Sequence, residues 1–129
     1  MTSEPLRSYR ELIGWQKSVE LVTQIYSITK EFPRDEIYGL TSQLRRSAVS
    51  VPSNIAEGQG RATKGEFIQF LGHARGSLFE IETQIVIAQK LGYITPEIES
   101  QIASRVTEVA RILNGLLTSL GISSRKTIH

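Results

Sequence analysis

Five basic side chains cluster in the middle of the sequence, and their chemistry is that of phosphate binding. They are Arg45, Arg46, Arg61, Lys64 and Arg75. Guanidinium and ammonium groups form strong charge-assisted hydrogen bonds with phosphate oxygens. Arg61 and Lys64 also flank the predicted start of a helix, where unpaired backbone amides attract anions. The alternative is that these charges are solvated or paired with nearby glutamates, and charge counting alone leaves the two interpretations even.

Residues suited to catalysis or metal binding are scarce. The chain contains one aspartate, Asp35, two histidines, His73 and His129, and no cysteine. A di-iron helical bundle needs Glu-x-x-His on two helices, and neither Glu80 nor Glu82 is followed by such a histidine. We therefore expect no catalytic residue, no metal and no cofactor, and we expect that the protein is not an enzyme.

The segment GQGRATKG, from Gly58 to Gly65, resembles a phosphate-binding loop only superficially. A P-loop has four residues between its glycines, ends in Gly-Lys-Ser/Thr and follows a strand. Here the order is Thr-Lys-Gly and a helix is predicted to precede it, so the nucleotide-binding interpretation is rejected.

Composition predicts one folded domain over residues 1–129. The chain has 129 residues and a net charge of +2, a length that suits a single hydrophobic core. No stretch approaches the ~20 consecutive apolar residues that span a bilayer, and the N-terminus lacks the apolar segment of a secretion signal. We expect a cytoplasmic protein without membrane contact.

Capping motifs and apolar spacing predict four helices that carry these side chains. Ser8 with Glu11, and Thr63 with Glu66, fit capping boxes. Thr95 is followed by proline and glutamate, the order expected at a helix start. Apolar residues then recur at intervals of three and four. The predicted helices cover residues 11–32, 35–57, 64–91 and 96–120, with loose tails at 1–7 and 121–129.

The second helix contains a proline, which raises the question of whether it is a helix at all. The segment SAVSV before Pro52 alternates like a strand. Over a wider window the helical spacing wins, because Ile37, Leu40, Leu44, Ala48, Val51 and Ile55 recur at three and four. Pro52 removes the amide that would bond the carbonyl of Ala48, at a cost of ~3 kcal/mol. We predict a helix bent at Pro52, with neighbouring serine and asparagine side chains bonding freed backbone groups.

Short connections between long helices predict an all-α fold, an antiparallel up-down-up-down four-helix bundle. The second and third helices carry more apolar residues than one core requires, and a second buried face would explain them. The predicted oligomer interface consists of Val49, Pro52, Ala56, Ile68, Phe79 and Val86. The alternative is the scatter of exposed aliphatic residues common on protein surfaces.

Four segments resemble a known family. They are YRELIGWQKSVELVTQIYSITKEFP, YGLTSQLRRSAVSVPSNIAEGQGR, KGEFIQFLGHARGSLFEIETQI and LGYI, which together cover most of residues 9–120. They are similar to the four-helix-bundle proteins encoded by intervening sequences in bacterial 23S rRNA genes. That family is in turn similar to the accessory variability proteins of diversity-generating retroelements, which are pentamers that bind nucleic acid and a reverse transcriptase.

The resemblance carries over onto particular positions. Arg45 and Arg46 match the family's paired basic residues, and Arg61 and Lys64 fall where basic residues usually follow the turn. The central signature is matched by Ser50, Pro52, Asn54, Glu57 and Gly58. The resemblance implies a pentamer with a basic surface, and it says more about fold and assembly than about function.

Two functions are therefore expected, and neither is enzymatic. In the first, a homo-oligomer binds structured RNA or DNA by phosphate contacts from the five basic residues, with little base readout. In the second, the same surface is a scaffold that docks a partner protein, such as a reverse transcriptase, and nucleic acid binds only loosely. Steep salt dependence favours the first, and a salt-tolerant protein partner favours the second.

Overall fold

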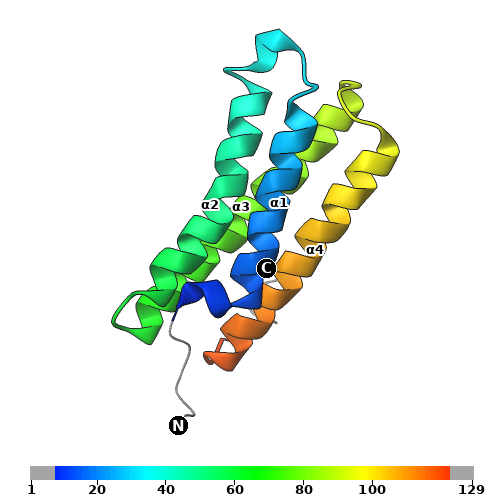
Figure 1. Cartoon of the computed structure of the whole chain (residues 1–129). Coiled ribbons are helices and arrows are strands. Elements are labelled where there is room, and N and C mark those ends of the chain that lie inside the picture. Colours follow the sequence, from blue (N-terminus) through cyan, green and yellow to red (C-terminus); the bar gives the residue numbers. More distant parts are fainter. Residues whose placement is uncertain (1–7, 123–129) are drawn as a thin grey trace.

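The computed structural model describes residues 8–122, which form an antiparallel bundle of four α-helices (Figure 1). The helices are α1 (Ile13–Thr29), α2 (Leu40–Gln59), α3 (Lys64–Lys90) and α4 (Pro96–Ser119). Each helix packs against two neighbours, in the cyclic order α1, α2, α3, α4. The predicted all-α four-helix bundle is confirmed.

The start of α1 differs from the prediction because Ser8 caps a different element. Its hydroxyl accepts a hydrogen bond from the amide of Arg10 at 3.0 Å and so caps a 3₁₀ turn over Tyr9–Glu11. The α-helix begins only at Ile13, and it ends at Thr29 rather than at residue 32. The Ser8–Glu11 capping pattern thus predicted that a helical segment starts here, but not that this segment is a 3₁₀ turn.

The start of α2 also lies later than predicted, at Leu40 instead of residue 35. A second 3₁₀ turn, Arg34–Glu36, occupies the expected first turn. The side chain of Glu36 then accepts a hydrogen bond from the amide of Leu40 at 2.9 Å. Because this carboxylate caps α2 from four residues upstream, no Ser, Thr, Asp or Asn at the N-cap is needed.

The α2 helix continues through Pro52, as the apolar spacing predicted. Pro52 is buried within the chain, so it serves packing. The side-chain amide of Asn54 donates to the carbonyl of Ser50 at 2.8 Å, and not to the carbonyl of Ala48 that Pro52 leaves without its usual donor. The bend at Pro52 stays a prediction.

The starts of α3 and α4 lie where the capping residues predicted them. Thr63 accepts from the amide of Glu66, and Thr95 accepts from that of Ile98, each at 3.1 Å. Inward-facing aliphatic residues of all four helices form one core, whose large members with no exposed surface include Leu21, Ile25, Leu44, Ile55, Leu71, Leu78, Ile81, Ile102 and Leu113. Among residues 8–122, no helix combines the length and hydropathy that a bilayer span requires.

At Gly58 the α2 helix approaches α3 closely. A β-carbon at Gly58 would lie 2.7 Å from the Cβ of Phe70 and 3.0 Å from a ring carbon of Phe67. Since the Cβ of Phe70 is fixed to the α3 backbone, the side chain cannot swing aside to make room. Glycine at this position therefore sets how closely the two helices pack.

We expect Gly58→Ala to destabilise the protein by about 1–3 kcal/mol, the usual cost of overpacking a close contact. Gly76→Ala is the matched control, because a β-carbon there meets nothing within 4 Å and alanine favours the helix by roughly 0.5–1 kcal/mol. Urea unfolding followed by circular dichroism measures both changes. Equal stability of Gly58→Ala and the wild type would contradict the packing constraint.

Candidate nucleic-acid interface

Arg45 is held in place by neutral groups of α1. Its Nε donates to the hydroxyl of Thr29 at 2.8 Å, and its guanidinium carbon lies 4.6 Å from the centre of the Tyr26 ring. The side chain is half-buried, and it forms no ion pair with any residue in 8–122. The guanidinium is thus oriented, while no carboxylate in the described part of the chain compensates its charge.

Arg75 is held in the same manner, but by α4. Its Nη1 donates to the side-chain oxygen of Asn114 at 2.9 Å, and the residue is half-buried. No carboxylate of the described chain pairs with it. Arg75 is therefore a second cation whose position is set by a neutral acceptor.

The α1–α4 face shows the opposite arrangement. Arg105 pairs with Glu20, and Lys17 lies 3.6 Å from Glu108. Both of these cations are neutralised by a carboxylate, whereas Arg45 and Arg75 have none among residues 8–122. What distinguishes Arg45 and Arg75 is that neutral groups orient them, on the flanks of α2 and α3.

Arg61 and Lys64 lie at the turn between α2 and α3. The guanidinium of Arg61 is 3.2 Å from the carboxylate of Glu57 and 4.8 Å from the centre of the Phe70 ring. Lys64 is the exposed first residue of α3 and has no ion-pair partner in residues 8–122. An exposed pair such as Arg61–Glu57 is weak in water, so both cations can still attract an anion.

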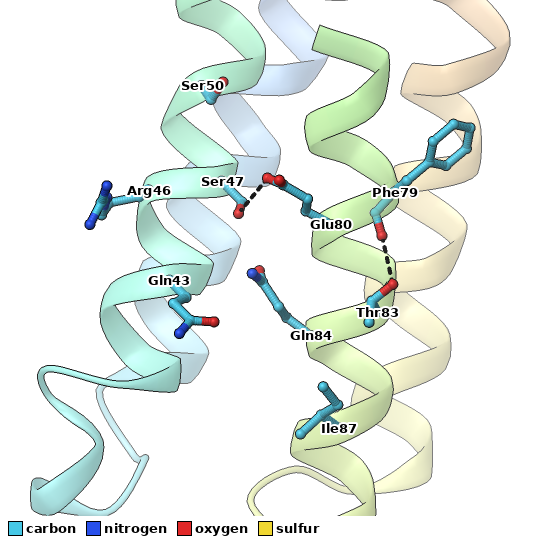
Figure 2. A pocket seen from close by; sticks show the side chains of 9 residues that line it. All are labelled: Gln43, Arg46, Ser47, Ser50, Phe79, Glu80, Thr83, Gln84 and Ile87. Carbon is cyan, nitrogen blue, oxygen red and sulfur yellow. Dashed lines mark hydrogen bonds between the residues drawn. The ribbon is translucent and has the colours of Figure 1, made fainter. Parts of the chain in front are cut away.

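Arg46 lies beside an open groove between α2 and α3. The groove has a volume of about 740 Å³, and its lining residues are Gln43, Arg46, Ser47, Ser50, Phe79, Glu80, Thr83, Gln84 and Ile87. Figure 2 shows Arg46 projecting from α2 away from α3, while Ser47 and Glu80 face each other across the groove. Their hydrogen bond is 3.2 Å long. Arg46 is exposed and has no partner among the described residues.

The five predicted basic residues do not share one patch. Arg45 contacts α1, whereas Arg75 contacts α4, so the two lie on opposite flanks of the α2–α3 pair. Arg46 and Arg61 are separated by most of the length of α2, roughly 20 Å at the helical rise per residue. Phosphate binding by these residues stays a prediction, and any ligand that contacts all five must be longer than one side-chain pocket.

Comparison with known proteins identifies the family. The family model described as 23S rRNA-intervening sequence protein matches residues 10–115. The chain belongs to this family. A crystal structure of a protein of unknown function from the S23 ribosomal protein family of Bacteroides thetaiotaomicron has the same fold, with a TM-score of 0.77 and 24% identity over 82% of this chain and 96% of that one. Among curated proteins there is no match.

This family member exposes only part of its predicted oligomer interface. Val49, Phe79 and Val86 are 40%, 58% and 41% exposed, so they are available to a partner. Ala56 is half-buried, and Ile68 packs against the core. Pro52, the sixth predicted residue, is buried in the chain and offers little surface. Helical spacing alone could not distinguish the exposed residues of this set from the buried ones, because it does not show where the neighbouring helices lie.

No cluster of three or more potential metal ligands is found in residues 8–122. His73, which the sequence analysis considered for catalysis or ligation, is exposed, and its ring lies 6.0 Å from that of Phe70. Glu80 and Glu82 belong to no such cluster within residues 8–122. The other histidine of the sequence, His129, lies outside the described residues.

A contact between Glu36 and Tyr93, which the sequence analysis missed, ties two connections together at one end of the bundle. The hydroxyl of Tyr93 donates to the carboxylate of Glu36 at 2.8 Å, and the Tyr93 ring lies 5.2 Å from that of Phe32. The carboxylate that caps α2 is thereby linked to the α3–α4 connection. Glu36 and Tyr93 are 57 positions apart in the sequence, so no local sequence pattern could predict their contact.

The contact shifts the pKa values of Glu36 and Tyr93 in opposite directions. The hydrogen bond from the Leu40 amide, followed by that from Tyr93, lowers the pKa of Glu36 below its ordinary 4.5. The hydrogen bond to Glu36 raises the pKa of Tyr93 above its ordinary 10.0. The folded state thus favours ionised Glu36 and neutral Tyr93. Its added stability is present between these values, and it is lost as the pH falls through the folded pKa of Glu36 or rises through that of Tyr93.

Tyr93→Phe should lower the midpoint of thermal unfolding at pH 7, because it removes the hydroxyl but keeps the ring contact. The difference from the wild type should shrink as the pH falls through the lowered pKa of Glu36, where its carboxylate becomes protonated. Tyr38→Phe is the control and should change nothing, since Tyr38 is 95% exposed. A difference that is independent of pH would refute the role assigned to the Glu36 carboxylate.

Proposed function

We propose that this protein is a non-enzymatic homo-oligomer that binds structured RNA or DNA through phosphate contacts. The observation that carries the proposal is the burial and the hydrogen bonding of Arg45 and Arg75. Both guanidinium groups are half-buried and oriented by neutral partners, and neither has a carboxylate within the described chain. Arg61 and Lys64 add charge at the turn between α2 and α3.

Partial burial of Arg45 and Arg75 carries a free-energy cost. A cation that loses hydration without gaining an opposite charge is unfavourable, and an external anion offsets that cost. A guanidinium whose Nε is already held, as in Arg45, still presents its terminal amino groups to a phosphate, which accepts paired hydrogen bonds from arginine. Since the contacts are to phosphate, binding should depend little on base sequence.

The separation of these cations favours an extended ligand over a small one. Arg45 and Arg75 lie on opposite flanks of the α2–α3 pair, so one mononucleotide cannot reach both. A nucleic acid backbone presents phosphates at regular intervals over a long surface. The family description refers to 23S rRNA-intervening sequences, which makes structured RNA the first ligand to test.

The number of copies is a separate part of the proposal. Exposed Val49, Phe79 and Val86 supply apolar surface for self-association. Five copies is the number implied by the resemblance to the accessory variability proteins, and it is proposed here on that basis.

The test is binding of labelled structured RNA and duplex DNA across a salt series. Replacing Arg45 and Arg75 by glutamine should weaken binding to both and reduce the slope of log affinity against log salt by about 2 for each copy that contacts the nucleic acid, roughly one unit for each lost phosphate contact. Arg34→Gln combined with Arg111→Gln removes the same charge at exposed positions and should change the slope less. Equal curves for the first variant and the wild type would overturn the phosphate contacts and favour a scaffold that docks a partner protein.

A further inference from the structure

A second groove, between α3 and α4, has an apolar floor and an acidic rim. Its volume is about 260 Å³, and the lining residues are Glu82, Thr83, Ile85, Val86, Glu99, Ile102, Ala103 and Val106. Ile85, Ile102 and Val106 are core residues, and Val86 is 41% exposed. A small aliphatic side chain could cover this floor and remove Val86 from water.

Neither carboxylate of the rim has a partner among residues 8–122: Glu82 and Glu99 form no side-chain hydrogen bond and no ion pair there. Glu99 is in addition half-buried. The rim would therefore attract a cation of another copy, and its negative charge disfavours a nucleic acid phosphate.

The complementary feature lies on α2 of the same chain. Arg46 and Val49 are exposed and are separated by one helical turn, so they project from the same side of α2. Val49 is 40% exposed, and Arg46 has no acidic partner in the described residues. Figure 2 shows the Arg46 side chain directed outward from α2 and away from α3.

We propose that the α3–α4 groove of one copy receives the Arg46–Val49 segment of a second copy. Val49 covers the apolar floor beside Val86, and Arg46 lies between the carboxylates of Glu82 and Glu99. The inference rests on the homo-oligomer part of the proposed function, and it assigns Arg46 to assembly instead of phosphate binding.

The two surfaces differ, so the contact is head-to-tail. Each copy carries one segment and one groove, and repetition of such a contact closes a ring or extends a filament. The groove accepts only a few side chains. Since a stable interface buries roughly 1,200–2,000 Å², the flanking exposed residues of α2 and α3 must also take part.

The experiment uses charge reversal and mixing, with the mass in solution measured by light scattering. Arg46→Glu gives a variant with an acidic segment and an acidic groove, and it should have a smaller mass than the wild type. The double variant Glu82→Lys and Glu99→Lys, with a basic segment and a basic groove, should also have a smaller mass. In an equimolar mixture the segment of each variant fits the groove of the other, so the mixture should gain mass over either variant alone. A ring of five cannot alternate throughout and keeps one unfavourable contact, so the mixture need not reach the full wild-type mass.

The controls separate the contact from general charge effects and from folding. Arg34→Glu and Glu31→Lys reverse exposed charges away from both surfaces and should retain the wild-type mass. Circular dichroism verifies that all variants remain helical. Single variants that keep the wild-type mass, or a mixture with no more mass than either variant alone, would overturn the contact.

A monomeric wild type would overturn both this contact and the homo-oligomer. The phosphate part of the proposed function has its own readout, because RNA binding by the wild type is measured in the salt series and not by mass. Failure of the groove contact and failure of nucleic acid binding are therefore distinguishable.

Discussion

The close packing of α2 against α3 is the constraint on which the rest of the structure depends. Gly58 allows the α2 backbone to approach the Cβ of Phe70, and Ser50 and Ser77 share a hydrogen bond of 2.8 Å across the same seam. Small residues at the contact hold the helices at short range, as small residues do wherever helix backbones approach closely.

This packing decides which surfaces remain available for function. On the outer flanks of α2 and α3, Arg45 contacts α1 and Arg75 contacts α4, and each has a neutral acceptor there. The ion pairs between α1 and α4 lie on another face. Cations oriented on two flanks, and apolar side chains left on the outer faces, are what an assembly that follows a long polyanion would need.

Sequence patterns predicted the helices well because their information is local. Spacing of apolar residues identified α2 as a helix through Pro52, and Thr63 and Thr95 marked the starts of α3 and α4. The start of α2 was misplaced because its cap comes from Glu36, which a 3₁₀ turn positions. The separation of Arg45 from Arg75 depends on which helix lies beside each of them, and no local pattern contains that information.

Sedimentation of the unmodified protein with a labelled structured RNA at low salt shows whether a homo-oligomer binds nucleic acid. We expect the RNA to sediment in one complex with several copies of the chain. As salt is added, the RNA should dissociate while the copies of the protein stay associated. RNA that sediments alone, or with a single copy, would contradict this expectation.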